Sequence, residues 1–178
     1  MNKTVIGVVG GGQLCRMMGE AIAARSLPYS LIALAPTEQC PAYDFLAAQI
    51  VGNFKDQDKI RELAQRADVV TYEIELAGSR VLEELEAEGK PVHPDPETLT
   101  TIQDKYIQAC FLEAHKIPVP NFMRVGDSAD FARAMSMFGL PLMVKARRDS
   151  YDGQGNYILR RPDQVDDGRE DDAEQAHH

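Results

Sequence analysis

The chain has 178 residues, of which 44% are hydrophobic, and its 28 acidic residues outnumber its 19 basic residues to give a net charge of −9 at pH 7. This length and apolar content can bury one good core or two small ones, and the acidic surplus argues against nucleic acid as a partner. No apolar run approaches the roughly 18 residues of a membrane span, and the N-terminus lacks the pattern of a signal peptide, so we expect a soluble cytoplasmic protein.

The first half of the chain alternates between strand-like and helix-like patterns. In chain order, the apolar spacing predicts a strand at 4–9, a helix at 13–24, a strand at 29–35, a short helix near 43–48, a strand at 50–51, a helix at 58–66, a strand at 69–72, a helix at 79–88 ended by Gly89, and a short strand at 91–93. Such βαβ units joined by short loops predict a parallel sheet between layers of helices, which is a Rossmann-like α/β fold.

Three glycines, Gly10, Gly11 and Gly12, separate the first strand from the first helix. A helix N-terminus after a glycine turn presents unpaired N–H groups and favours negative charge, so we expect a ligand there. On this interpretation, Gly11→Val would block the ligand and leave the sheet intact. The pattern nearly matches the dinucleotide fingerprint, with Cys15 in its small-residue position, but residues 29–36 supply no acidic side chain to hold a ribose. An NAD-dependent oxidoreductase is therefore a weaker alternative.

The prolines Pro94 and Pro96 predict a domain boundary, so the expected domains are 1–95 and 96–165. Residues 166–178 contain six acidic residues, one arginine and no apolar side chain larger than alanine, and they should form a disordered acidic tail. The cysteines Cys15, Cys40 and Cys110 are widely spaced in apolar surroundings, which indicates reduced structural thiols and no metal site.

The second domain should contain a helix at 97–115 with a break near Asp104, a strand at 122–125 and a helix at 128–138 capped by Ser128 and closed by Gly139. Two hairpin strands should follow around positions 143 and 157, with Val144 and Ile158 buried. This order of elements is consistent with an α+β lobe.

The segment from Lys145 to Asn156 is a cationic strand end followed by a short glycine loop. Because the preceding strand is apolar, Lys145 should emerge at the sheet edge with its ammonium free to meet an anion. Gly153 and Gly155 allow backbone N–H groups to approach phosphate oxygens closely. The same pattern also fits an ordinary hairpin turn.

Six motifs occur in one order along the chain: Gly10 to Leu14 with Arg16 and Met17, Asp68 to Glu75, Pro94 to Glu97, Gln103 to Lys105, Ile117 with Pro118, and Tyr151 to Asn156. In these motifs the chain resembles the ATP-grasp family of N5-carboxyaminoimidazole ribonucleotide synthetases. The resemblance covers about residues 5–159. It implies a Rossmann-like pre-ATP-grasp domain and the first α+β lobe of an ATP-grasp domain, without the second lobe that family members have.

The resemblance also implies roles for individual residues. The substrate aminoimidazole ribonucleotide would be held by Gly10, Gly11, Gly12, Gln13, Leu14, Glu73 and Glu75. ATP would be bound by Lys105, Lys145, Tyr151, Asp152, Gly153, Gln154, Gly155 and Asn156. Alternatively, one of the two glutamates only caps the next helix. The catalytic residues stay unknown; Arg147 and Arg148 are candidates for neutralising carboxyphosphate, or they form a solvated basic edge.

The reaction implied by the resemblance is phosphoryl transfer from MgATP to bicarbonate, followed by capture of the carboxyl group by the amine of aminoimidazole ribonucleotide. The magnesium ligands and the adenine-binding segment are expected in the missing lobe, so the isolated chain should be inactive. Asp149 and Ser150 stand where the family commonly has glycine, and the added carboxylate should repel ATP phosphates. A non-catalytic nucleotide-binding module is an alternative, and the oligomeric state, a homodimer included, stays open.

Overall fold

The computed structural model describes residues 3–150 and 155–165. The chain divides into two compact units, residues 1–102 and 103–178. Helix α4 (Pro96–Ile102) belongs to the first unit, because Leu99 is fully buried in the core of that unit and Thr100 donates a hydrogen bond of 2.8 Å to Glu83 on helix α3. The boundary therefore lies after α4, whereas the prolines placed it before this helix.

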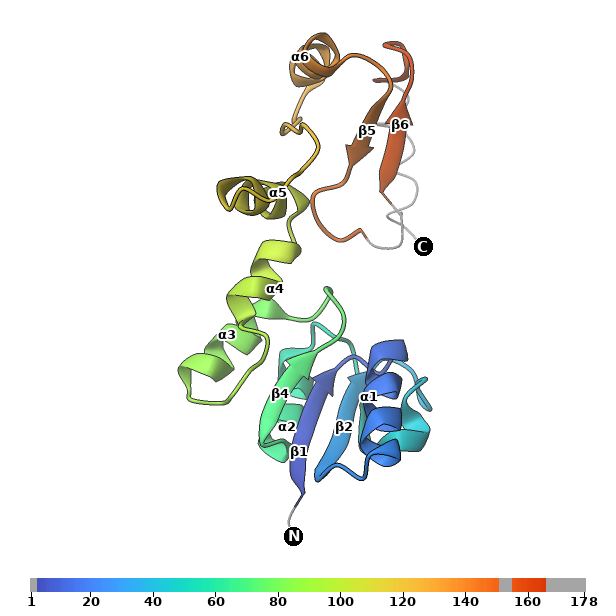
Figure 1. Ribbon diagram of the computed structural model, residues 1–178, viewed down its shortest axis with the longest axis vertical. Helices are drawn as coiled ribbons and strands as arrows, with labels where there is room; N and C mark the ends of the chain where they lie inside the picture. The colour runs from blue at the N-terminus through green and yellow to red at the C-terminus, as the bar shows by residue number, and fades with distance from the viewer. Residues whose placement is uncertain (1–2, 151–154, 166–178) are drawn as a thin grey trace. The chain divides into compact units, whose positions relative to one another are not determined.

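The first unit is built on four parallel strands: β1 (Thr4–Val9), β2 (Tyr29–Ala35), β3 (Leu46–Val51) and β4 (Val69–Tyr72). Their order across the sheet is β3-β2-β1-β4 (Figure 1). This confirms the expected parallel α/β sheet. The carboxyl ends of β1 and β4 are neighbours, since Val9 lies opposite Tyr72, and this brings the residues after both strands to the same edge.

Helices cover both faces of this sheet because successive strand residues point to opposite sides. Helix α1 (Gln13–Ala24) packs through Cys15 on the face that contains Val8 and Ala33. Helices α2 (Gln57–Arg66) and α3 (Ser79–Ala87) cover the opposite face with Val9 and Leu34. Both apolar clusters exclude water, and burial of each large side chain contributes about 1.5–3 kcal/mol.

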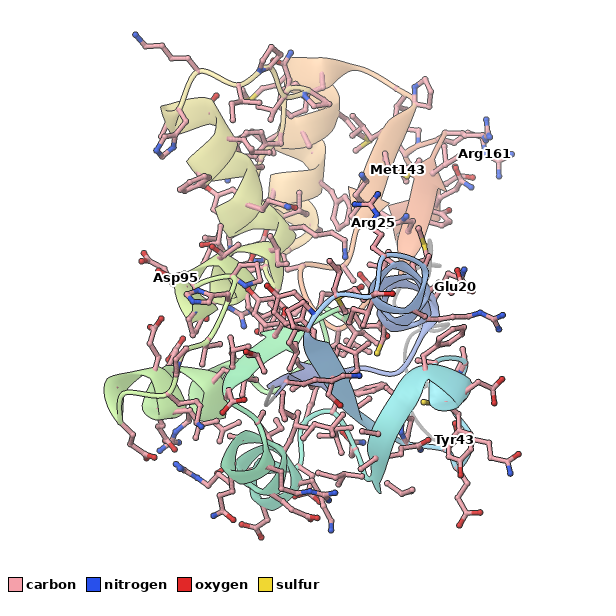
Figure 2. The ribbon with its side chains drawn as sticks, turned by 60° about the horizontal axis from the view of Figure 1, so that its bottom comes forward. Glu20, Arg25, Tyr43, Asp95, Met143 and Arg161 are labelled. Carbon is pink, nitrogen blue, oxygen red and sulfur yellow. The ribbon has the colours of Figure 1, made fainter. Side chains whose placement is uncertain are left out.

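The second unit contains helix α5 (Lys105–Ala114), helix α6 (Ser128–Phe138) and the antiparallel hairpin of β5 (Leu142–Lys145) and β6 (Asn156–Leu159). Large apolar side chains of the hairpin remain exposed to solvent. Met143, labelled on β5 in Figure 2, is 54% exposed, and Ile158 is 39% exposed. The expectation that Val144 and Ile158 are both buried is wrong, since Val144 is only half-buried. A two-stranded sheet covered on one side buries one row of side chains, here including Leu159.

The structure corrects four of the expected elements, two in the first unit and two in the second. Residues 43–48 form only a short 3₁₀ helix, η1 (Tyr43–Phe45), before β3 begins at Leu46, because the chain then pairs with β2. Tyr43 itself points into solvent (Figure 2). The expected strand at 91–93 is a single bridge between Val70 and Val92.

Residues 122–125 form no strand; instead Phe122 packs edge-on against the Tyr106 ring, with centroids 5.8 Å apart. The cap of α6 is Asp127, which accepts the N–H of Asp130 at 2.9 Å, and Ser128 is the first helical residue. The break near Asp104 and the closing glycine Gly139, with φ 74°, are confirmed. In the part of the chain that the structure describes, no helix is long and apolar enough to cross a membrane.

Candidate functional site

The glycine turn between β1 and α1 is tightly enclosed by side chains. Gly10 has φ +119°, and a Cβ atom there would lie 2.4 Å from the Cγ of Glu73. A Cβ at Gly12 would lie 2.7 Å from a Glu73 oxygen, and one at Gly11 would lie 2.5 Å from the sulfur of Cys40. Side chains of the protein itself therefore restrict all three positions: Gly10 also by its positive φ, Gly11 by a buried cysteine, and Gly12 only by the movable end of Glu73.

Glu73 follows β4 and places its carboxylate at the N-terminus of α1. It accepts the backbone N–H of Gly12 and, at 2.8 Å, that of Cys15. Gly12 offers no side chain as a cap, so this carboxylate satisfies donors that the helix leaves unpaired and meets the positive end of its dipole. Glu73 thus caps the first helix of the chain, not the helix that follows β4.

The remaining predicted substrate residues lie around this cap. Gln13 and Leu14 occupy the first turn of α1 and face solvent, with Leu14 57% exposed. Glu75 is half-buried two residues beyond Glu73. The structure therefore brings Gly10, Gly11, Gly12 and Glu73 into direct proximity, and it leaves Gln13 and Leu14 on the outer side of the turn.

Two buried cysteines, Cys15 and Cys40, lie next to the glycine turn. Burial, together with the nearby charge of Glu73, raises the pKa of Cys15 to about 12, and burial also raises the pKa of Cys40. A thiol with a raised pKa is a poor nucleophile, so both act as packing groups. The glycine pattern alone could not reveal Cys40, because its contact with Gly11 spans 29 positions of the sequence.

In the second unit, Lys105 lies at the start of α5 and reaches the segment after β5. Its ammonium donates to the carbonyl oxygen of Ser150 at 2.9 Å and also contacts the Ser150 hydroxyl. Its backbone N–H donates to the carbonyl of Arg147 at 2.9 Å. Two residues about 45 positions apart are thereby held together, and Lys105 lies next to the cationic segment.

Asp104 is the residue that the sequence interpretation missed as a site residue. Its side chain is fully buried and accepts the backbone N–H groups of Tyr106 and Ile107, at 3.0 and 3.2 Å. It also accepts the guanidinium groups of Arg147, with Nε at 3.1 Å, and Arg148, with Nε at 3.1 Å. Arg147 first, and the backbone and Arg148 donors after it, lower the pKa of Asp104 to about 2 despite its burial.

Arg147 and Arg148 therefore do not form a purely solvated edge. Arg147 presents two donors to the two oxygens of Asp104, and its guanidinium carbon lies 5.4 Å from the centre of the Tyr106 ring. Arg148 uses one donor and keeps a side chain that is 54% exposed. The only sequence signal for this cluster was the aspartate at the predicted helix break.

Lys145 ends β5 opposite Asn156 on β6, and both are exposed. Within residues 3–150 and 155–165, the Lys145 ammonium forms no ion pair. Gly155 has φ +70°, and its carbonyl accepts the N–H of Ala146 at 2.8 Å, which closes the hairpin. The predicted ATP residues Tyr151, Asp152, Gly153 and Gln154, like the expected tail at 166–178, lie outside the described residues.

The described part of the chain contains no group of three His, Cys, Asp or Glu side chains that could hold a metal ion. The free thiols are Cys15, Cys40 and Cys110.

Comparisons with known families agree with this division of the chain. Residues 1–103 match the ribonucleotide synthetase preATP-grasp domain, and residues 110–177 match the ATP-grasp domain. Phosphoribosylaminoimidazole carboxylase, chloroplastic, from Vigna aconitifolia is 37% identical over 92% of this chain and 28% of that protein. N5-carboxyaminoimidazole ribonucleotide synthase from Pseudomonas aeruginosa is 34% identical over 90% of this chain and 43% of its own length.

Solved structures of similar proteins share the fold. N5-carboxyaminoimidazole ribonucleotide synthetase from Thermotoga maritima superposes with a TM-score of 0.79 at 36% identity, covering 92% of this chain and 43% of that one. N5-carboxyaminoimidazole synthase from Aspergillus clavatus, in complex with ADP and 5-aminoimidazole ribonucleotide, gives a TM-score of 0.80 at 30% identity, covering 95% and 44%. The chain spans less than half the length of each of these proteins.

Proposed function

Because the chain belongs to the ribonucleotide synthetase preATP-grasp family and continues into an ATP-grasp match, we propose that it is part of an ATP-dependent ligase that carboxylates 5-aminoimidazole ribonucleotide in purine biosynthesis. The observation that carries the proposal is in the second unit. There Lys105 is held against the segment that contains Lys145, Arg147 and Arg148. Two lysines on these two short segments, Lys105 and Lys145, suit the phosphates of a nucleotide, and the related Aspergillus clavatus protein is bound to ADP.

In the proposed reaction, an oxygen of bicarbonate attacks the γ-phosphorus of ATP and ADP leaves, which gives carboxyphosphate. The amine nitrogen of the ribonucleotide then attacks the carboxyl carbon, phosphate leaves, and the nitrogen loses a proton to give the N5-carboxylated product. Phosphoryl transfer depends mainly on positioning and neutralisation of charge. Lys145, exposed at the end of β5, and the third donor of Lys105 would supply part of that charge.

For the ribonucleotide we propose contacts at the glycine turn of the first unit, with Glu73. The N–H groups of Gly12 and Cys15 are already engaged by the Glu73 carboxylate. A second anion at the same donors would be repelled by that charge, so we assign the turn to the hydroxyl or amine end of the substrate instead of its phosphate. Gln13 and Leu14 would contribute from the outer side of the turn.

Magnesium is proposed as the ion that accompanies ATP in this reaction; residues 3–150 and 155–165 contain no group of three His, Cys, Asp or Glu side chains that could hold it. We therefore assign no step of the reaction to the metal. Bicarbonate as the carboxyl donor, a homodimer and a cytoplasmic location are likewise proposals; the Vigna aconitifolia relative is named as chloroplastic.

Calorimetric titration of the 178-residue chain tests the proposal, with MgADP, aminoimidazole ribonucleotide and NADH as separate ligands. We expect heat of binding for MgADP that Lys145→Ala removes, and heat for the ribonucleotide that Glu73→Gln reduces. Lys116→Ala, a charge change at the end of α5, is the control for MgADP. Binding of NADH in place of both ligands would overturn the proposal in favour of an oxidoreductase.

A further inference from the structure

Capping of α5 does not by itself explain why the Asp104 side chain is buried. Asp56 and Asp127 cap α2 and α6 by the same kind of backbone hydrogen bond, and both stay exposed. Asp104 caps α5 with a fully buried side chain. Removing a carboxylate from water is costly unless charged partners replace the lost hydration, so its burial depends on the two arginines.

The arginines tie the start of α5 to the segment after β5. Three further contacts join the same two places: the Lys105 N–H to the Arg147 carbonyl, and the Lys105 ammonium to the carbonyl and hydroxyl of Ser150. Lys105 follows Asp104 directly, and Lys145 precedes Arg147 by two residues. The cluster thus joins the helix start that carries Lys105 to the segment that follows Lys145.

We propose that Asp104 is a positioning residue of the nucleotide site: by holding Arg147 and Arg148, it fixes Lys105 relative to Lys145. The inference rests on the proposed function, because the two lysines are the cations assigned there to nucleotide phosphates. It also changes the role of Arg147. Both oxygens of Asp104 receive its guanidinium, so Arg147 organises the segment and is not available to neutralise carboxyphosphate.

The sign of one substitution separates positioning from simple electrostatics. Asp104→Asn removes a negative charge that contacts Arg147 and Arg148 and adjoins Lys105, so charge alone predicts tighter binding of an anionic nucleotide. Positioning predicts weaker binding, by about tenfold or more, because misplaced binding groups lose most of their effect. Calorimetry of the 178-residue chain with MgADP measures this difference. Equal or tighter binding by the folded variant would overturn the proposal.

Two further variants complete the binding experiment. Asp163→Asn removes the same charge from an ion pair with Arg161 that is about 70% exposed, and it should leave MgADP affinity unchanged. Arg147→Lys serves if Asp104→Asn does not fold. It keeps the charge but loses the planar fork, and it should also weaken MgADP several-fold. Unchanged affinity in Arg147→Lys would contradict the proposal.

A measurement without nucleotide keeps the inference separate from the proposed function. If Asp104 only caps α5, Asp104→Asn speeds hydrogen exchange only at the amides of Tyr106 and Ile107, which donate hydrogen bonds to the Asp104 carboxylate. If it positions the segment, the amides of Lys105 and Ala146 also exchange faster, since they bond to Arg147 and Gly155. Failure of the unmodified chain to bind MgADP would count against the proposed function, whereas unchanged exchange at Lys105 and Ala146 would count against the role of Asp104.

Discussion

At the scale of single residues, Asp149 shows how backbone and charge combine. Its φ of 55° lies in the left-handed region, where glycine is favoured over side chains with a Cβ. The resemblance had already indicated that glycine is common at this position in the family. The structure gives the reason, because the chain turns there between Arg148 and Ser150, the residues that contact Asp104 and Lys105.

We expect Asp149→Gly to have two separate effects. It should raise the free energy of unfolding by about 0.5–1 kcal/mol, because glycine adopts the left-handed conformation without strain. The energy of the contact that the Asp149 carboxylate makes is subtracted from this gain. It should also tighten MgADP by on the order of 1 kcal/mol by removing a like charge. Denaturant unfolding and calorimetry measure the two quantities.

Two control variants divide these effects. Asp149→Asn removes the charge and tolerates the same φ, so it should tighten MgADP without the gain in stability. Lys116→Gly relieves a similar φ of 59° at the end of α5 and should stabilise the chain without tightening the nucleotide. Unchanged affinity in both Asp149 variants would remove the electrostatic argument.

Asp104 also predicts how stability depends on pH. Its ordinary pKa is 3.8 and its pKa in the folded protein is about 2, so its ionised form is favoured by folding. The stability that it contributes is therefore full above about pH 5 and is lost as the pH falls through 3.8 toward 2. The difference in free energy of unfolding between the unmodified chain and Asp104→Asn should be constant from pH 5 to 7 and shrink in acid. A difference that is flat down to pH 2 would contradict this.

At the scale of elements, the glycine turn depends on packing as much as on conformation. The expectation that Gly11→Val leaves the sheet intact is contradicted by the space available: a Cβ there meets the sulfur of Cys40 at 2.5 Å and the Cβ of Ala35 at 3.1 Å. Cys40 and Ala35 are buried, so neither can move into solvent. The turn is part of the core under α1.

We therefore predict that Gly11→Val destabilises the first unit by about 1–3 kcal/mol, which is the usual cost of overpacking a core. Thermal unfolding followed by circular dichroism measures it. Gly126→Val is the matched control, since its Cβ would meet only an oxygen of Asp130 at 3.6 Å. A Cys40→Ala change, which removes the sulfur and keeps the Cβ, should restore part of the stability of Gly11→Ala; no restoration would mean that the sulfur is not the obstacle.

Much of the element order followed from local patterns, and the misses have physical causes. Strand β4 and the helix ends at Gly89 and Gly139 were predicted because the spacing of apolar residues and the position of a glycine after a helix are local signals. The strand expected at 122–125 does not form: Phe122 packs on the Tyr106 ring, and the segment pairs with no described strand. Pairing depends on distant residues that no local pattern contains.

The candidate site was predictable to the same extent. Lys105, Lys145 and the glycine turn were identified by type and motif, and their roles remain predictions. The contact of Glu73 with the first helix spans 61 positions, and that of Arg147 with Asp104 spans 43. Only the fold reveals such contacts, and they decide which charges are free to meet a ligand.

At the scale of the whole molecule, the chain spans 43% of the Pseudomonas aeruginosa relative and 44% of the Aspergillus clavatus structure. The parallel sheet and the first part of an ATP-grasp domain are both present. Among the described residues there is no group of three His, Cys, Asp or Glu side chains that could hold a metal ion.

We predict that the purified 178-residue chain does not turn over ATP. Neutralising the transferred phosphoryl group requires metal and cations together, and the two lysines alone leave much of its charge uncompensated. A coupled assay for ADP, with and without bicarbonate, measures turnover. Bicarbonate-dependent release of ADP that Lys145→Ala abolishes would show that the chain is sufficient.

Because two of the three thiols are buried at the glycine turn, their rate of reaction with a thiol reagent measures how often this turn opens. Cys15 and Cys40 are 0% and 4% exposed behind the glycine turn, while Cys110 is half-buried on α5 in the other unit. A thiol reagent reacts only when its target is both uncovered and ionised. Pulse labelling followed by mass spectrometry would therefore record how often the turn opens in solution, with the half-buried Cys110 as a reference thiol in the same sample.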